Sequence, residues 1–316
     1  MALKEPAITD RFSLVVGPVL TYWPRQRLLD FYDAVAASAA DTVVLGEVVC
    51  SRRHEMKPDD WLAIGRELRA AGKRVRLASQ ALLESESDLR GVRRLAEQDE
   101  FAVEAGDVAA VHRLAARRVP FVIGPHVNVY SRPALEEYAR FGAAHWVAPA
   151  ELSIDTVAHV NPAADPVRGA DGAPVPTEVY AFGRLPLAFS ARCFTARHHR
   201  LSKDSCEFRC IEDPDGLLLA SSEGQPFLVL NGTQTQSAAQ HCLVGDRPAL
   251  AAAGVSALRL SPCAERFAEV IDVFDAVMNR GADVREGERA LHALALPGGL
   301  ANGFAHARPG LEWAGA

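Results

Sequence analysis

Short apolar runs alternate with helical patterns along the first half of this chain, and this alternation limits the fold more than any other feature. The runs FSLVVGPVL (12–20) and TVVLGEVVC (42–50) are each followed by a stretch with helical periodicity. The same alternation predicts βαβ units and a parallel sheet. Further strand segments are expected at 74–79, 101–106, 120–131 and 145–152. This many units before residue 160, without a GxGxxG turn, favour a (β/α)8-like (TIM-type) barrel over a six-stranded doubly wound sheet.

The regular alternation stops near residue 160, where a stretch rich in Pro, Gly, Ala and Asp begins (160–178). Residues 178–193 then read as extended chain, and 216–232 as a hairpin around Ser-Glu-Gly-Gln-Pro. The barrel pattern returns with a strand at 255–262 and a helix at 264–281 that ends at Gly281. We therefore expect one α/β barrel-like domain over 1–316, in which the barrel can be incomplete or irregular. A loop and hairpin region is inserted at about 155–245. Its part from 160 to 245 contains clustered cysteines.

Composition and charge narrow the class of protein. A chain of 316 residues with 49% hydrophobic residues can bury a large core. A net charge of -6 argues against broad binding to nucleic acid or membrane surfaces. The sequence MALKEPAITDRFS lacks a signal-peptide pattern, and no apolar run reaches transmembrane length, so we expect a cytoplasmic protein. In that compartment thiols stay reduced, which makes metal or redox chemistry the better interpretation of the six cysteines.

Three of those cysteines lie within eighteen positions in the pattern C-x12-C-x3-C. They are Cys193, Cys206 and Cys210. Asp204 and Glu207 have the spacing of a capping box, which predicts a helix that begins beside them. Cys206 and Cys210 would then share one helix face and reach one metal centre. The helix start would also favour a thiolate at Cys206.

Charge around these cysteines points to an anionic ligand. Residues 191–210 carry five cations against two carboxylates, five minus two or +3, in a chain that is negative overall. A four-iron, four-sulfide cube held by four thiolates is anionic, and so is a Zn(Cys)4 site. Structural zinc sites usually use two short C-x2–4-C pairs, whereas this chain offers one short pair, which favours iron and sulfur while leaving zinc open.

A fourth thiol is needed to complete such a site. Cys50 is the best placed, because it follows a predicted barrel strand and is followed by Arg52 and Arg53. Cys242 and Cys263 are read as small buried residues, with Cys263 as the substitute for Cys50. The adjacent histidines 198 and 199 are alternative ligands, although adjacent loop histidines are more often solvated.

Several motifs together resemble the collagenase-like peptidase superfamily, in particular its members that act in oxygen-independent ubiquinone biosynthesis. The matching segments are C-x12-C-x3-C, LGEVVCSRR, GPHVNVYS, NGTQTQS and NGFAHARPG, spread over nearly the full length. The resemblance implies that Cys50, Cys193, Cys206 and Cys210 bind a [4Fe-4S] cluster. Ala305, before His306, stands where the family usually carries an aromatic residue.

The same resemblance implies partners and an activity. The expected partners are a UbiU-like iron–sulfur paralogue, as a heterodimer, and a UbiT-like lipid-binding protein. The expected role is hydroxylation of a ubiquinone precursor without O2, as a component of an anaerobic hydroxylase complex, with prephenate as oxygen donor. The alternatives are a non-catalytic partner with a structural cluster or zinc site, and a peptidase-fold protein that acts on RNA or peptide.

Other enzymatic motifs are missing from the sequence. It contains no HExxH, no GxSxG and no Walker A loop, and His54-Glu55 lacks the second histidine of a zinc protease. His241 and Cys242 cannot form a catalytic dyad merely because they are adjacent. Polar residues at the predicted strand ends are expected to line a cavity, and of these Glu47 and His126 are the acid/base candidates. The others are Glu104, Asn128 and Glu151.

Overall fold

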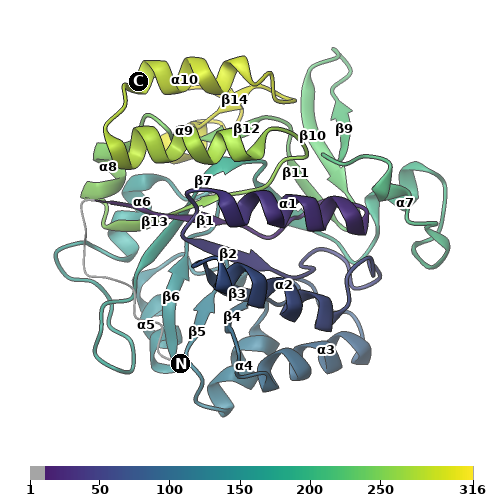
Figure 1. Ribbon diagram of the computed structural model, residues 1–316, viewed down its shortest axis with the longest axis horizontal. Helices are drawn as coiled ribbons and strands as arrows, with labels where there is room; N and C mark the ends of the chain where they lie inside the picture. The colour runs from purple at the N-terminus through teal and green to yellow at the C-terminus, as the bar shows by residue number, and fades with distance from the viewer. Residues whose placement is uncertain (1–10, 316) are drawn as a thin grey trace.

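Eight parallel strands form a closed barrel in the computed structural model, which describes residues 11–315 (Figure 1). Strand β13 pairs with both β1 and β7 and so closes the barrel, which confirms the predicted fold class. The barrel strands are β1 (Ser13–Val16), β2 (Thr42–Leu45), β3 (Arg74–Ala78), β4 (Ala102–Ala105), β5 (Phe121–Ile123), β6 (Ala143–Val147), β7 (Thr177–Gly183) and β13 (Val255–Leu260).

Amphipathic helices cover the outside of the barrel and bury one apolar face each against it. Ser85, Asp107, Ser131 and Ser153 cap four of them, each side chain accepting a hydrogen bond from a first-turn amide. The helices are α1 (Arg25–Ala37), α2 (Pro58–Ala70), α3 (Glu86–Glu97), α4 (Val108–Ala116), α5 (Arg132–Arg140), α6 (Ile154–Val160), α8 (Arg247–Ala252), α9 (Phe267–Arg280) and α10 (Val284–Ala293). As predicted, α9 ends at Gly281, whose φ of 75° is left-handed.

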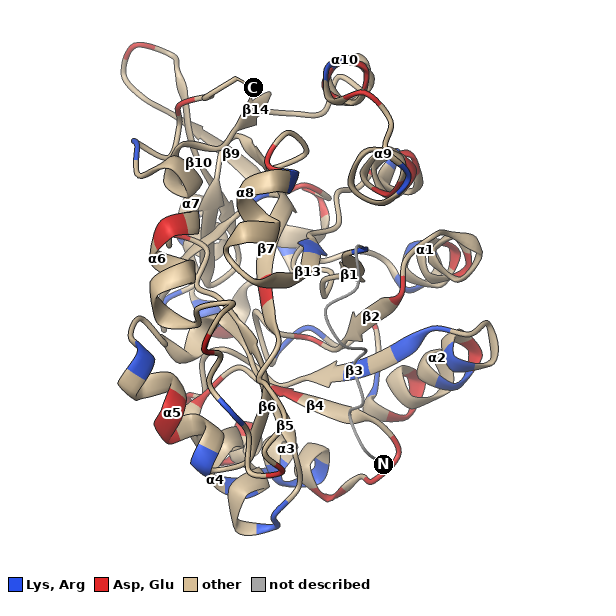
Figure 2. Ribbon diagram, turned by 90° about the vertical axis from the view of Figure 1, so that its left-hand side faces the viewer, with Lys and Arg blue, Asp and Glu red and all other residues tan. Residues whose placement is uncertain are grey.

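The barrel interior contains buried charges as well as apolar side chains. Arg259 of β13 donates to Glu104 of β4 at 2.8 and 2.6 Å and to Glu178 of β7 at 2.6 Å, so it spans the barrel. Glu178 also accepts from Arg76 at 2.7 Å and contacts His145 at 2.9 Å. The charged positions on β3, β4 and β7 are visible in Figure 2. These pairs satisfy groups that would otherwise be costly to bury.

An insertion between β7 and α8 forms a second, antiparallel sheet beside the mouth of the barrel. Its strands, in sheet order, are β8 (Pro186–Phe189), β11 (Gln234–Ser237), β10 (Pro226–Asn231) and β9 (Leu217–Ala220). Strands β9 and β10 pair across residues 221–225, where the sequence predicts a hairpin. The insertion also carries helix α7 (Phe194–His198) and two 3-10 turns, Lys203–Ser205 and Arg209–Ile211.

The boundary of the insertion differs from the expected one. Residues 177–183, which the sequence assigned to the inserted region, form β7 of the barrel wall. The loop at 161–176 separates β7 from the earlier regular pattern, and this long spacing hid the place of the extended segment in the barrel. Two short strands, β12 (Gln240–Cys242) and β14 (Leu300–Ala301), extend the barrel sheet from the end of β7. Within residues 11–315, no helix is long and apolar enough to cross a membrane.

Candidate functional site

Four free cysteines line one hollow between the loop after β2 and the insertion. They are Cys50, Cys193, Cys206 and Cys210, the set implied by the family resemblance. Each is half-buried, whereas Cys242 and Cys263 are buried at other places. Cys263 lies in a separate small hollow beside Arg184 and Asp215. The structure therefore brings together thiols that are up to 160 positions apart in the chain (210 minus 50).

The thiols of the hollow are not grouped as the ligands of a single metal ion among the described residues. Thiolates on one Zn²⁺ lie roughly 4 Å apart, because four bonds of about 2.3 Å diverge tetrahedrally. Among residues 11–315, no three His, Cys, Asp or Glu side chains are grouped closely enough to hold one ion. A four-iron cube takes each thiolate at a different corner, so its four sulfur ligands stand farther apart.

Cys50 lies in a tight loop that begins directly after β2. Gly46 has a φ of 125°, and a Cβ there would lie 2.8 Å from the carbonyl oxygen of Ala78, so the turn requires glycine. The carboxylate of Glu47 then accepts hydrogen bonds from the amides of Val49 and Cys50, at 2.9 and 3.1 Å. Glu47 is thus part of the scaffold that positions this thiol.

Cys193 lies at the N-terminal end of α7, where its Sγ accepts a hydrogen bond from the amide of Ala196 at 3.4 Å. Cys206 ends the first 3-10 turn and Cys210 lies within the second. The three thiols of the insertion therefore come from three successive short elements. Such elements place side chains in directions that a single helix cannot.

The prediction of one helix that contains both Cys206 and Cys210 is wrong. Glu207 and Phe208 have left-handed φ values of 52° and 53°, which break the chain between the two 3-10 turns. Asp204 pairs with Arg52 of the β2 loop at 2.8 Å instead of forming a capping box with Glu207. Contacts with the barrel, distant in sequence, thus replace the local helix signal.

A buried guanidinium, that of Arg53, faces the four thiols. Its side chain is 1% exposed, donates to the carbonyl of Leu20 at 2.7 Å and to Asn231 at 2.6 Å, and lies 3.6 Å from Glu47. Its Nε atom has no hydrogen-bond partner among the described residues. A buried cation with an unsatisfied donor beside four thiols favours an anionic ligand in the hollow.

Burial and the Arg53 charge act in opposite directions on two of the thiols. Burial raises the pKa of Cys50 and of Cys210, and the nearby Arg53 partly offsets this by favouring the thiolates. Since metals bind thiolates, a metal bound here would displace protons and would bind more tightly as the pH rises. Three further cations line the hollow: Arg52, Lys203 and Arg209.

The NGTQTQS segment (231–237) fastens the insertion onto the barrel around these thiols. Thr233 donates to the carbonyl of Val49 at 2.7 Å, next to Cys50. The amide of Gly232 donates to the hydroxyl of Thr195 in α7 at 3.0 Å. Asn231 donates to the carbonyl of Leu20 at 2.8 Å. In the sequence this motif counted only as part of a resemblance. Its unbroken run of polar side chains was the signal of a buried hydrogen-bond network.

The remaining candidate residues lie away from the thiols. Neither His198 nor His199 is among the described residues that line the hollow. Glu104 lies in the barrel interior, paired with Arg259. His126 lines another hollow, together with Asn128 and Glu151, so the two acid/base candidates, Glu47 and His126, are in different places.

The C-terminal NGFAHARPG segment anchors the end of the chain. The side chain of Asn302 exchanges two hydrogen bonds with the backbone of Ala314, at 2.7 and 3.0 Å. His306 lies 3.2 Å from Asp246, in the loop before α8. These contacts give the motif a structural role away from the thiols.

Comparison with known proteins identifies similar proteins over most of the chain. The profile of peptidase family U32 matches residues 28–315. The solved U32 peptidase Mk0906 is 14% identical, with 82% of this chain and 96% of that chain covered and a TM-score of 0.44. A phospho-2-dehydro-3-deoxyheptonate aldolase from Thermotoga maritima is 12% identical, with 94% and 74% covered and a TM-score of 0.42. Likenesses this distant carry no functional argument.

Proposed function

This chain belongs to peptidase family U32, and from that premise we propose that it is an iron–sulfur protein of the UbiV type, which binds a [4Fe-4S] cluster at Cys50, Cys193, Cys206 and Cys210. The observation that carries the proposal is the convergence of these four thiols on one hollow beside the buried Arg53. The donor set is all sulfur, which suits iron–sulfur ligation.

The surrounding residues suit an anionic cluster. Arg53 offers a buried charge and a free Nε donor, and Lys203 and Arg209 add positive charge at the rim. Such groups stabilise a cluster and influence its reduction potential. When bound, the cluster supplies electron transfer or helps to activate an oxygen donor. The chain itself holds the thiols in place and limits their access to solvent.

The proposed context is hydroxylation without O2 in ubiquinone biosynthesis. In this proposal the chain forms a heterodimer with a UbiU-like paralogue in the cytoplasm, assisted by a UbiT-like lipid-binding protein. The ubiquinone precursor and prephenate are the proposed small molecules. The support is the resemblance of five sequence segments, together with the grouping of the four cysteines that two of these segments contribute.

Metal analysis after oxygen-free purification tests the cluster. We expect a brown protein with about four iron and four sulfide per chain. Cys206→Ala should lose most of the iron and the visible absorption, because one ligand is missing. Cys242→Ala is the matched control, since Cys242 is fully buried outside the hollow, and it should keep its iron. Zinc in place of iron and sulfide in the wild-type protein would disprove the proposal.

The same variant separates an active subunit from a non-catalytic partner whose cluster is structural. If the cluster takes part in hydroxylation, Cys206→Ala should still form the heterodimer with the paralogue while anaerobic hydroxylation stops. If the cluster is structural, the complex itself should dissociate. Size-exclusion chromatography of the co-expressed pair and quinone analysis of anaerobic cultures give the two readouts.

A further inference from the structure

A lobe of positive charge borders the hollow of the four thiols. Residues 191–212, which we call the basic lobe, contain α7 and both 3-10 turns and project from the side of the barrel (Figure 1). They carry five cations and three carboxylates, five minus three or +2. The rest of the chain therefore carries -8, because the whole chain carries -6. Positive charge is thus concentrated on one part of a negative molecule.

Three exposed arginines of the basic lobe have no carboxylate partner. They are Arg192, Arg197 and Arg200. Within residues 11–315, none of their guanidinium groups makes an ion pair or a hydrogen bond. The carboxylates of the lobe are engaged by other cations, since Arg209 pairs with Glu207 at 3.5 Å and with Glu212 at 2.5 Å. Asp204 pairs with Arg52 at 2.8 Å. The three arginines are therefore free to bind carboxylates of another molecule.

The fold holds these arginines at the surface beside the thiols. Ala196 is buried and lines the thiol hollow, whereas the next residue, Arg197, is exposed. The amide of Leu201 donates to the carbonyl of Ala196 at 2.8 Å, so the chain folds back after α7 and keeps Arg200 close to this turn. Arg192 directly precedes the first thiol of the lobe. A molecule bound to these side chains would lie over the thiol hollow.

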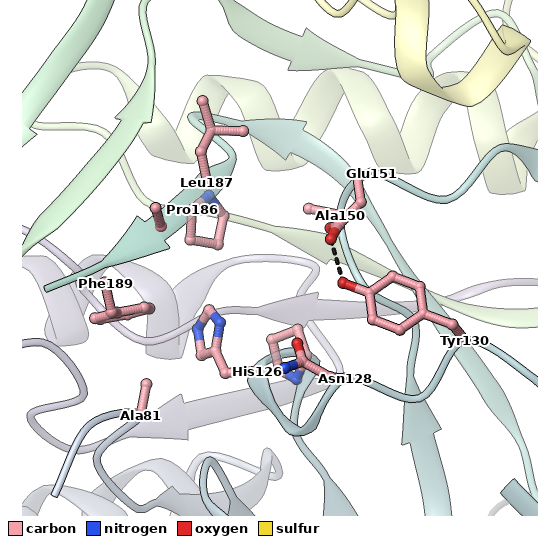
Figure 3. Close-up of a pocket in the computed structure, with 11 residues that line it drawn as sticks. Ala81, His126, Asn128, Tyr130, Ala150, Glu151, Pro186, Leu187 and Phe189 are labelled. Atoms are coloured by element: carbon pink, nitrogen blue, oxygen red, sulfur yellow. Dashed lines mark hydrogen bonds between the residues drawn. The ribbon is translucent and has the colours of Figure 1, made fainter. Parts of the chain in front are cut away.

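The hollow at the mouth of the barrel, drawn in Figure 3, lacks such positive charge. No Lys or Arg is among the described residues that line it, and it contains the carboxylate of Glu151. Four cations line the thiol hollow: Arg52, Arg53, Lys203 and Arg209. An anionic partner is therefore attracted to the thiol hollow and its lobe, not to the mouth of the barrel.

Charge and position favour a small acidic protein as this partner. Electrostatic attraction would turn its negative face towards the basic lobe, while the negative charge of the rest of the chain would repel it from other surfaces. A nucleic acid fits less well, because it is negative along its whole length and would meet that repulsion beyond the lobe. Proteins that carry single electrons form small, transient interfaces, which suits a surface of this size.

We propose that the basic lobe is the docking surface for an acidic carrier of single electrons, a flavodoxin-like or ferredoxin-like protein whose carboxylates bind Arg192, Arg197 and Arg200. The inference rests on the proposed cluster, which would lie directly beneath the bound carrier. In the step that follows docking, one electron leaves the reduced carrier and enters the oxidised cluster. No bond forms or breaks and no proton moves.

Titration with a purified flavodoxin, an acidic protein that contains FMN, tests the docking. At low ionic strength we expect one flavodoxin to bind per chain, and added salt should weaken the binding. Arg197→Glu and Arg200→Glu should each weaken it about tenfold, equivalent to about 1.4 kcal/mol. Arg113→Glu is the matched control, because Arg113 of α4 is also exposed and its side chain has no partner within residues 11–315. This control should bind flavodoxin as the wild type does.

Electron transfer provides a second readout on the same variants. After anaerobic mixing with reduced flavodoxin, the visible absorption of the wild-type protein should bleach, and in Arg197→Glu this should be about tenfold slower when the carrier is limiting. Photoreduction by deazariboflavin, an uncharged small molecule, should reach the same final bleaching in both proteins. The variant would then differ in docking and not in its cluster.

Iron and sulfide content, measured on the same samples, separates this inference from the cluster assignment. A wild-type protein without iron would disprove the cluster and with it the entry of electrons. Iron-loaded protein that binds no flavodoxin, or binds it equally well after both arginine changes, would overturn the docking surface alone. Tighter binding of a single-stranded RNA through the same arginines would also overturn it. So would loss of the co-purified paralogue from Arg197→Glu, because the lobe would then belong to the heterodimer interface.

Discussion

His241 and Cys242 illustrate how burial decides the chemistry of a single side chain. Both lie on β12 and are buried. Burial lowers the pKa of His241 to about 4 and raises the pKa of Cys242 to about 12. Both groups are therefore uncharged near neutral pH, which leaves no imidazolium and thiolate pair for catalysis.

The buried histidine predicts how stability depends on pH. In the unfolded chain a histidine takes up a proton near pH 6.5, whereas folded His241 does so only near pH 4. Between these values the unfolded state binds more protons, so the free energy of unfolding falls as the pH falls. His241→Asn should reduce this slope by up to about 1.4 kcal/mol per pH unit. Urea unfolding of both proteins across this range provides the measurement.

Two comparisons complete this experiment. His126, whose pKa is also lowered, contributes a slope of the same sign, so some pH dependence should remain in the variant. Above pH 8 histidine is neutral in both states, and the difference in stability between the two proteins should become constant. Equal slopes in the acidic range would contradict the prediction.

At the scale of elements, short segments of the insertion depend on the barrel for their shape. Helix α7 has five residues, too few to be stable alone. Its Thr195 bonds to Gly232, and the next residue of that segment, Thr233, bonds to the β2 loop. The insertion is therefore built from weak elements that a buried hydrogen-bond network holds together.

Removing one bond of this network should affect both stability and metal binding. Thr233→Val keeps the shape of the side chain but leaves the carbonyl of Val49 unpaired, which should cost about 1–3 kcal/mol. Because Val49 precedes Cys50, we also expect faster loss of iron from the proposed cluster. Iron release to a chelator under anaerobic conditions, followed by visible absorption, measures this effect.

Thr235→Val is the matched control for this prediction. Thr235 lies two residues further along, on β11, and its hydroxyl makes no hydrogen bond within residues 11–315. Its replacement should change neither unfolding nor iron release. If Thr233→Val behaved like Thr235→Val, the hydrogen bond to the β2 loop would have no role in holding the site.

At the scale of the whole molecule, the buried ion pairs connect strands on opposite sides of the barrel. Arg259 of β13 reaches Glu104 of β4, while β13 itself closes the barrel between β1 and β7. The same guanidinium also pairs with Glu178. Buried ion pairs thus connect the late strands to the early ones, in addition to the backbone hydrogen bonds between neighbouring strands.

Arg259→Met should strongly destabilise the fold. It leaves Glu104 and Glu178 buried without their main counter-charge, which should cost about 3–5 kcal/mol. A second change, Glu104→Gln, should recover part of the loss because it removes one of the unpaired charges. Arg140→Met, which breaks an exposed pair with Glu137, should leave the urea midpoint unchanged. A loss no larger for Arg259→Met than for Arg140→Met would contradict a role in closing the barrel.

The sequence determined the fold class because hydrophobic periodicity is a local property. Strands at 42–45, 74–78 and 255–260 and the helix that ends at Gly281 could be read from short windows. Residues 178–193 were read as extended chain, but the place of β7 in the barrel was not predicted, because it depends on pairing with β6 and β13, which local composition does not reveal. The four candidate cysteines were predicted from their spacing in the sequence and from the resemblance to a known family.

Tertiary structure alone decided how those cysteines are arranged. The pairing of Arg52 with Asp204 joins residues 152 positions apart and replaces the helix that local capping signals predicted. The burial of Arg53, the network of Asn231 and Thr233, and the separation of His126 from Glu47 are likewise products of long-range packing. Short stretches of the sequence specify which segments form helices and which form strands. The positions of side chains relative to one another depend on the packing of the insertion against the closed barrel, because this packing removes the surfaces of both from water.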